Sequence, residues 1–292
     1  MKNIKTKLMI ASLLISIITA YIYFFQLIRT IDTNNRNCYN ACPTITKNIE
    51  DSVFIDNDLY VVSFNKKTKF ANYVAHKVKK ENILGAFKER EYVKDPKLFA
   101  TDTVFSEDYK NANLLCKYDK GHLATLSDFS NNKDSYKLNY SSNIVPQSSF
   151  INQVPINKLE RQIQSLTSIY DDIYVVTGVF YKKNALMCEW NVNKRIDYII
   201  PTGYYKIILA IKDKIIYTST FVFDANDKSD KICNYASNIE YVSKIANTEF
   251  SFKDSEKIKE FNCKDDFSNI KKLKPLRTTN NITLFKNKVS YW

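Results

Sequence analysis

The chain has 292 residues, of which 45% are hydrophobic, so it can bury a sizeable core, and a single domain is the simplest organisation. Only four glycines and six prolines occur, which excludes long disordered linkers. The formal net charge of +12 favours a polyanionic partner such as nucleic acid, and a lysine-rich composition without functional meaning is the alternative.

The N-terminal segment predicts export from the cytoplasm. Three lysines precede an uncharged stretch at residues 8–28, which as a helix would match the bilayer core of about 30 Å. Two interpretations of residues 1–29 stay open: a signal peptide cleaved near Ala20, or an uncleaved membrane anchor. In both cases the basic end stays inside, and residues 30–292 form one exported domain.

The first predicted strands lie soon after this segment. β-Branched and aromatic residues predict a strand at 59–64 and a partner strand at 70–78, joined by a polar turn. A further strand is expected at 87–92, and Asp95-Pro96 ends it. A short strand should then end near His122.

The clearest helix is predicted at residues 150–170, because apolar residues recur there at steps of three and four. The stripe comprises Ile156, Leu159, Ile163, Leu166 and Ile169. Pro155 fits the first turn of such a helix.

The second half of the chain is predicted to be rich in strands. They are expected at 173–178, 198–201, 204–211 and 215–223, with a hairpin turn at 213–214 and a late helix at 239–245.

Residues suited to phosphodiester chemistry gather between positions 118 and 160. The chain reads Tyr-Asp-Lys-Gly-His at 118–122, Ser-Asn-Ile-Val-Pro-Gln at 142–147, Phe-Ile-Asn-Gln at 150–153 and Leu-Glu at 159–160. An imidazole, an amide and a carboxylate in this order could build a one-metal site, with histidine as general base and oxygen ligands around Mg²⁺. His76, the other histidine, lies in a predicted strand and is more typical of a structural or exposed residue.

Other chemistries lack their motifs. The sequence has no glycine-rich phosphate loop, no His-Glu-x-x-His pair, and no serine in a sharp glycine-flanked turn that would serve a Ser-His-Asp triad. No two cysteines are separated by only two residues, which disfavours a structural zinc site, and six cysteines indicate an oxidising compartment.

This ordered series resembles the DNA/RNA non-specific endonucleases, the ββα-metal nucleases whose signature is Asp-Arg-Gly-His. Lys120 stands where the signature has arginine. Residues 68–75 and 175–178, together with Arg90, resemble the secreted bacterial members, so the resemblance covers roughly residues 38–263. It implies an α+β fold of the ββα-metal nuclease type, with a central, mostly antiparallel sheet flanked by helices.

The resemblance also implies a role for each residue of the predicted site. His122 would be the general base, Arg90 would clamp the pentacovalent phosphate, and Glu160 would hold a water of the metal. Asn152 would be the sole direct protein ligand of Mg²⁺, with Mn²⁺ as a possible substitute. The plainer alternatives are a helix-capping Asn152 and a solvated Glu160.

The remaining site residues would contact substrate or support the site. Lys120, Arg90 and Gln147 are the predicted substrate-binding residues. Lys120 keeps the charge of the family arginine but loses its bidentate fork, which should affect phosphate binding more than chemistry. Gln147 and Asn143 are alternatively supporting amides.

Two disulfides follow from the same resemblance. Cys38 would pair with Cys42, and Cys233 would pair with Cys263. Cys116 and Cys188 have no counterpart in the family, so they either pair with each other or stay free and buried.

The function implied is that of an exported, Mg²⁺-dependent endonuclease that cuts DNA and RNA and leaves 5′-phosphates, as a monomer or homodimer. It would be secreted, periplasmic or anchored to the outer side of the cytoplasmic membrane through the N-terminal segment. The alternatives are a membrane-tethered nucleic-acid-binding module without catalysis, used in DNA capture, and a purely structural exported protein. The intact set of His122, Asn152 and Glu160 favours the enzyme, because a decayed one should have lost at least one member.

Overall fold

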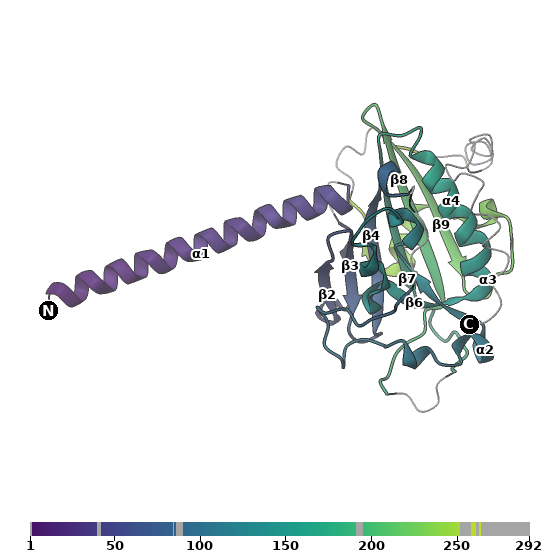
Figure 1. Ribbon diagram of the computed structural model, residues 1–292, viewed down its shortest axis with the longest axis horizontal. Coiled ribbons are helices and arrows are strands. Elements are labelled where there is room, and N and C mark those ends of the chain that lie inside the picture. The colour runs from purple at the N-terminus through teal and green to yellow at the C-terminus, as the bar shows by residue number, and fades with distance from the viewer. Residues whose placement is uncertain are drawn as a thin grey trace.

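The centre of the fold is a large twisted sheet (Figure 1). The computed structural model describes residues 2–39, 42–83, 85, 90–190, 195–251, 258–260 and 263. In this part of the chain the sheet has eight strands, in the order β10-β9-β8-β7-β4-β3-β2, with β12 beside β9. Neighbouring strands are antiparallel except β12, which runs parallel to β9.

The strands of this sheet are β2 Ser52–Asp56, β3 Tyr60–Asn65, β4 Phe70–Val78, β7 Asp172–Phe180, β8 Gly203–Lys212, β9 Ile215–Asp224, β10 Ala236–Ser237 and β12 Ile258–Glu260. Two small sheets pair β1 Thr44–Ile45 with β11 Thr248–Glu249, and β5 Tyr118–His122 with β6 Ile144–Ser148. The α-helices are α1 Lys2–Asn37, α2 Ala112–Cys116, α3 Ser149–Ile151, α4 Asn157–Leu166 and α5 Ile239–Ala246. Short 3₁₀ turns are η1 Ile49–Asp51, η2 Lys80–Asn82, η3 Glu107–Tyr109, η4 Leu126–Phe129, η5 Ser135–Asn139, η6 Ser141–Asn143 and η8 Ile232–Tyr235.

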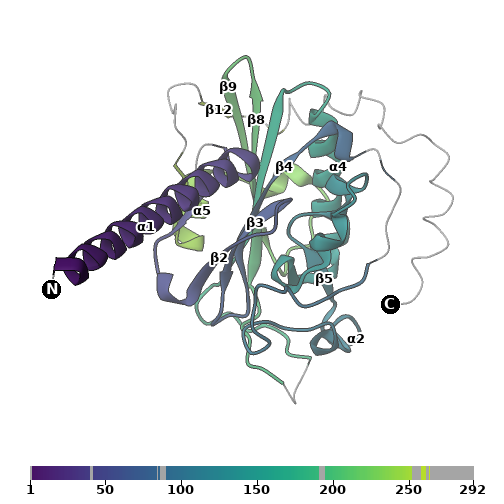
Figure 2. The ribbon, with the colours of Figure 1, turned by 60° about the vertical axis from the view of Figure 1, so that its left-hand side comes forward.

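The sheet separates two layers of the molecule (Figure 2). Successive strand residues point to opposite faces, so β7 buries Val175 on one face and Val176 on the other. The first face packs against α4 through Leu159 and Ile163, and the second packs against α5 through Val242. This arrangement confirms the expected α+β class with a mostly antiparallel sheet flanked by helices.

Helix α1 projects from the body of the protein (Figure 1). Large apolar side chains between Met9 and Phe24 are exposed along it. Within the described residues, no helix has an apolar stretch long enough to span a membrane. The division of the chain at residue 29 stays a prediction.

The predicted strands at 59–64, 70–78, 173–178, 204–211 and 215–223 are confirmed as β3, β4, β7, β8 and β9, each within two residues at either end. The strand predicted at 198–201 is wrong: this stretch is irregular, and Ile199 makes one backbone hydrogen bond to Thr68. Of the strand predicted at 87–92, residues 87–89 lie outside the described part, and residues 90–92 form no strand.

The helix predicted at 150–170 is divided and shorter. It comprises α3, a π-helical segment η7 at Asn152–Ile156, and α4, and it ends at Leu166. Pro155 lies inside the π segment. Proline has no N–H and its ring collides with the carbonyl four residues earlier, so the backbone widens there instead of continuing as an α-helix. The same wide turn carries Asn152.

All six cysteines form disulfides. Cys38–Cys42 and Cys233–Cys263 are present as predicted, and Cys116 pairs with Cys188, which closes one of the two alternatives left by the sequence. The third disulfide joins α2, directly before β5, to the segment that follows β7.

Candidate active site

The candidate site is built on the small β5–β6 sheet and the helical segment that follows it. The antiparallel register places Asp119 opposite Gln147 and His122 opposite Ile144. The motifs at 118–122 and 142–147, which the sequence separates by about twenty residues, are therefore adjacent in space. Segment η7 and helix α4 continue from β6 and carry the third and fourth motifs.

The carboxylate of Asp119 accepts four hydrogen bonds, which fix the positions of the donor side chains around it. Its Oδ1 accepts from Asn113 Nδ2 and Ser149 Oγ, each at 2.8 Å. Its Oδ2 accepts from Asn152 Nδ2 at 3.0 Å and Gln153 Nε2 at 2.8 Å. Because Asn152 gives its amide nitrogen to Asp119, its amide oxygen is the atom left to bind a cation.

His122 is held in one tautomer. Its Nε2 lies 3.0 Å from Oδ1 of Asn139, and an amide oxygen can only accept, so Nε2 carries the proton. In a neutral ring the lone pair is then on Nδ1, which is the nitrogen able to accept a proton from water. The ring of Tyr92 packs beside the imidazole, with centroids 5.5 Å apart.

The surroundings keep His122 neutral. Burial, and after it the positive charge of Arg90, lower the pKa of His122 to about 4, although the bond to Asn139 acts in the opposite direction. At neutral pH the imidazole is therefore unprotonated, as a general base must be.

Asn143 fixes the chain around His122. Its Nδ2 donates to the carbonyls of Ala124 and Leu138 at 2.9 and 2.8 Å, and its Oδ1 accepts from the Ala124 N–H at 2.8 Å. Asn143 is fully buried. It ties the segment after His122 to the segment that ends in Asn139, which matches the supporting role left open by the sequence.

The two predicted phosphate-binding cations meet at Tyr92. Lys120 Nζ donates to Ser106 Oγ at 2.7 Å and lies 4.8 Å from the Tyr92 ring centroid. Burial lowers the pKa of Lys120. Arg90 is exposed, and its side chain hydrogen-bonds to Tyr92, which counteracts the rise that burial causes in the pKa of that tyrosine. Both cations are thus placed near His122.

Glu160 lies in the first turn of α4, and its side chain is 15% exposed. Burial, with a smaller contribution from the carboxylate of Asp128, raises the pKa of Glu160 to about 6 against the opposing influence of Lys206. Lys206 Nζ is 3.7 Å from Glu160 Oε1, and the Thr125 side chain also hydrogen-bonds to Glu160.

Gln147 lies inside the β5–β6 sheet and is fully buried. A Cβ added at Gly121 would come within 1.9 Å of Gln147 Oε1, so only glycine permits this close packing. The packing favours the supporting role for Gln147. Its predicted contact with substrate stays a prediction.

His76 is a buried structural histidine. Its Nε2 lies 2.9 Å from Asp128 Oδ2, and Gln164 Nε2 donates to the other oxygen of the same carboxylate at 2.8 Å. The ring of Phe129 packs against it.

The site also contains residues that the motifs did not indicate. Asn139, Asn113 and Tyr92 carry no spacing signal, because each belongs to an irregular or short element. Lys206 does have a signal in the sequence, because it is a charged residue at an inward-facing position of β8, and the neighbouring residues on that face of the strand are apolar.

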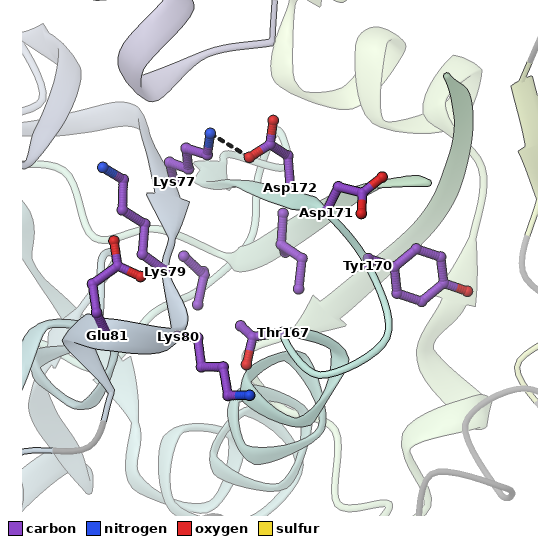
Figure 3. Close-up of a pocket in the computed structure, with 10 residues that line it drawn as sticks. Lys77, Lys79, Lys80, Glu81, Thr167, Tyr170, Asp171 and Asp172 are labelled. Atoms are coloured by element: carbon purple, nitrogen blue, oxygen red, sulfur yellow. Dashed lines mark ion pairs between the residues drawn. The ribbon is translucent and has the colours of Figure 1, made fainter. Parts of the chain in front are cut away.

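A separate pocket lies at the other end of α4 (Figure 3). Residues 77–81 and 167–173 contribute its lining, and an ion pair between Lys77 and Asp172 crosses it. The predicted site residues are absent from this described lining, so this pocket is distinct from the candidate site.

The donor groups fit the magnesium ion that the resemblance implies. Mg²⁺ prefers hard oxygen ligands and retains several waters, so one or two protein oxygens suffice. The Asn152 amide oxygen, which Asp119 orients, and the largely buried Glu160 carboxylate are oxygen donors of this kind.

Comparison with known proteins gives consistent results. Residues 40–257 match the DNA/RNA non-specific endonuclease family. The "Nuclease" of Serratia marcescens is 32% identical over 212 residues, which cover 71% of this chain and 77% of that protein. The mitochondrial Endonuclease G of Homo sapiens is 27% identical over 161 residues, which cover 51% of this chain and 52% of that protein.

Among solved structures, the crystal structure of the EndoG/EndoGI complex is similar to this chain with a TM-score of 0.59 at 21% identity. The match covers 71% of this chain and 89% of the other. At this identity it supports the fold alone, and it confirms the expected ββα-metal nuclease fold.

Proposed function

The chain belongs to the DNA/RNA non-specific endonuclease family and is an endonuclease, and we propose that it is exported and hydrolyses both DNA and RNA with Mg²⁺. One observation carries this proposal. Asn139 and Asp119 hold His122 and Asn152 so that each keeps the atom required for chemistry, a lone pair on Nδ1 and an amide oxygen.

In the proposed reaction, Nδ1 of His122 removes a proton from the attacking water. The neutral state of His122, which burial and the charge of Arg90 favour, makes this acceptor available at neutral pH. Arg90 and Lys120 bind the phosphate and stabilise the negative charge that grows on it in the transition state. The water oxygen bonds to phosphorus as the bond between phosphorus and the 3′ oxygen breaks, so one product carries a 5′-phosphate and the other ends in a 3′ hydroxyl, whose proton comes from solvent.

Asn152 and Glu160 would hold the metal. The Asn152 oxygen would be its direct protein ligand, and Glu160 would orient the waters around it. When bound, Mg²⁺ would polarise the phosphate and stabilise the leaving oxygen. Asp119 sets the orientation of Asn152, so its part is to position the ligand.

Activity on both DNA and RNA is expected because the site would contact the phosphate backbone that the two polymers share. Cations and a metal recognise the phosphate backbone, which carries no base sequence directly. The positive charge of the chain supports binding to either polymer.

Export is proposed from two features. Three disulfides are typical of proteins in an oxidising compartment, and the N-terminal segment has the basic start and apolar stretch of a signal peptide or anchor. The protein would therefore act outside the cytoplasm.

The test is to incubate the purified full-length protein with plasmid DNA and with ribosomal RNA. Both should be degraded with Mg²⁺, preserved with EDTA, and degraded again after excess Mg²⁺ is restored. Degradation of one polymer only would refute the proposed breadth, and binding without cleavage in every buffer would favour the nucleic-acid-binding module.

A further inference from the structure

One lysine lies where the fold should hold only apolar side chains. Lys206 is in the middle of β8, is 1% exposed, and faces α4 together with Tyr204 and Ile208, which are fully buried. A buried ammonium group is costly unless it is paired and hydrogen-bonded. Its position therefore requires a compensating function or partner.

The partners of Lys206 lead to the candidate site. Thr177 lies directly opposite Lys206 in the register of β7 and β8, and its Oγ1 accepts a hydrogen bond from Nζ at 2.8 Å. Beyond it, Nζ is 3.7 Å from Oε1 of Glu160. Strand β8 thus places the ammonium group of Lys206 beside the first turn of α4.

The opposite charge near Glu160 is held in place as well. The Asp128 carboxylate is bound by His76 from β4 and Gln164 from α4. Thr125 adds a hydrogen bond to Glu160. Lys206 from the sheet and Thr125 from the segment before η4 therefore hold the Glu160 carboxylate from two sides of the chain.

We propose that Lys206 is a positioning residue of the nuclease: its ammonium group, held by Thr177, fixes the orientation of the Glu160 carboxylate. The proposal rests on the proposed function, because Glu160 acts only if the site is catalytic. Lys206 contacts neither water nor phosphate in this mechanism. It should therefore affect kcat and leave KM for nucleic acid nearly unchanged.

A double-mutant cycle tests this dependence on Glu160. We expect Lys206→Met, which keeps the length and removes the charge, to lower kcat by about 10- to 100-fold, as for other residues that orient the groups around a metal. Glu160→Gln should lower kcat by at least as much. The double variant should be no slower than Glu160→Gln, since the lysine has nothing left to orient.

Thr177→Val tests the same route if Lys206→Met does not fold. It keeps the lysine and the shape of the threonine and removes the hydrogen bond, so kcat should fall by a smaller factor, and again only while Glu160 is present. Thr218→Val, the same change at a buried threonine of β9, is the matched control and should keep wild-type kcat.

Wild-type kcat in a folded Lys206→Met protein, or losses that multiply in the double variant, would overturn the inference and leave the nuclease assignment intact. If Lys206→Met does not fold, wild-type kcat in Thr177→Val would overturn it in the same way. If the wild-type protein cleaves neither DNA nor RNA with Mg²⁺, the inference about Lys206 and the proposed nuclease function are both overturned.

Discussion

Replacing His122 by asparagine should make the protein less sensitive to acid than the wild type. The pKa of His122 falls from an ordinary 6.5 to about 4 in the folded protein, mainly through burial. The unfolded chain therefore binds the proton more tightly than the folded one. The stability gained from the neutral ring is fully present above pH 6.5 and is lost as the pH falls through 4.

The size of the effect follows from the shift. A difference of about 2.5 pKa units, at about 1.4 kcal/mol per unit, corresponds to about 3 kcal/mol between pH 7.5 and pH 4. Other groups also titrate in this range. Glu160, whose raised pKa acts in the opposite direction, is present in both proteins, so its contribution cancels in the comparison.

The assay is urea unfolding of the full-length wild type and the His122→Asn variant, with EDTA present, at pH 7.5 and pH 4. The free energy of unfolding should fall by about 3 kcal/mol more in the wild type than in the variant. Equal losses in the two proteins would show that His122 is not held neutral by its surroundings, and the argument for its role as a base would fail.

The other predictions concern the metal ligand, its support and the disulfides. Asp119→Ala should lower kcat by about 10- to 100-fold and raise the Mg²⁺ concentration for half-maximal rate, because Asn152 loses its orienting partner. Asn152→Ala should abolish turnover in a plasmid assay, with partial recovery at high Mg²⁺ or Mn²⁺; full activity at ordinary Mg²⁺ would refute its assignment. Replacing Cys233 and Cys263 by serine opens a loop with a sequence separation of 30 and should lower the urea-unfolding free energy by about 3–4 kcal/mol.

The sequence was most informative where local pattern and tertiary structure agree. The long central strands were predictable, because β-branched and aromatic residues line β4, β7, β8 and β9 on both faces. The motif residues were predictable because the family spacing is ordered and specific. Their placement on β5, β6 and the following helix confirms the local organisation.

Other features depend on contacts that no local pattern encodes. The bond between His122 and Asn139 joins a strand to a 3₁₀ turn, and no spacing rule indicates that asparagine. The pairing of Cys116 with Cys188 spans 72 residues, so the fold had to bring the two together. The strand expected at 198–201 does not form: Tyr198 and Ile200 are buried by packing in an irregular segment, and Ile199 between them is exposed.

Two misjudged features show where tertiary structure overrides local preference. Pro155 was expected in the first turn of a helix, yet it lies within a π-helical turn next to the metal-ligand candidate. Lys206 lies within a predicted strand of apolar residues, and a charged residue at an inward-facing position is itself a signal of a polar partner.

The central claim, that His122 is the base of a nuclease site, is tested most directly by the cleavage rate of His122→Ala. Single-turnover cleavage of a DNA duplex should be measured with excess enzyme and saturating Mg²⁺, alongside DNA affinity in EDTA. We predict that the rate falls by at least about 100-fold while affinity changes little, since Arg90 and Lys120 remain to bind phosphate. A rate near that of the wild type in a nuclease-free preparation would contradict the account.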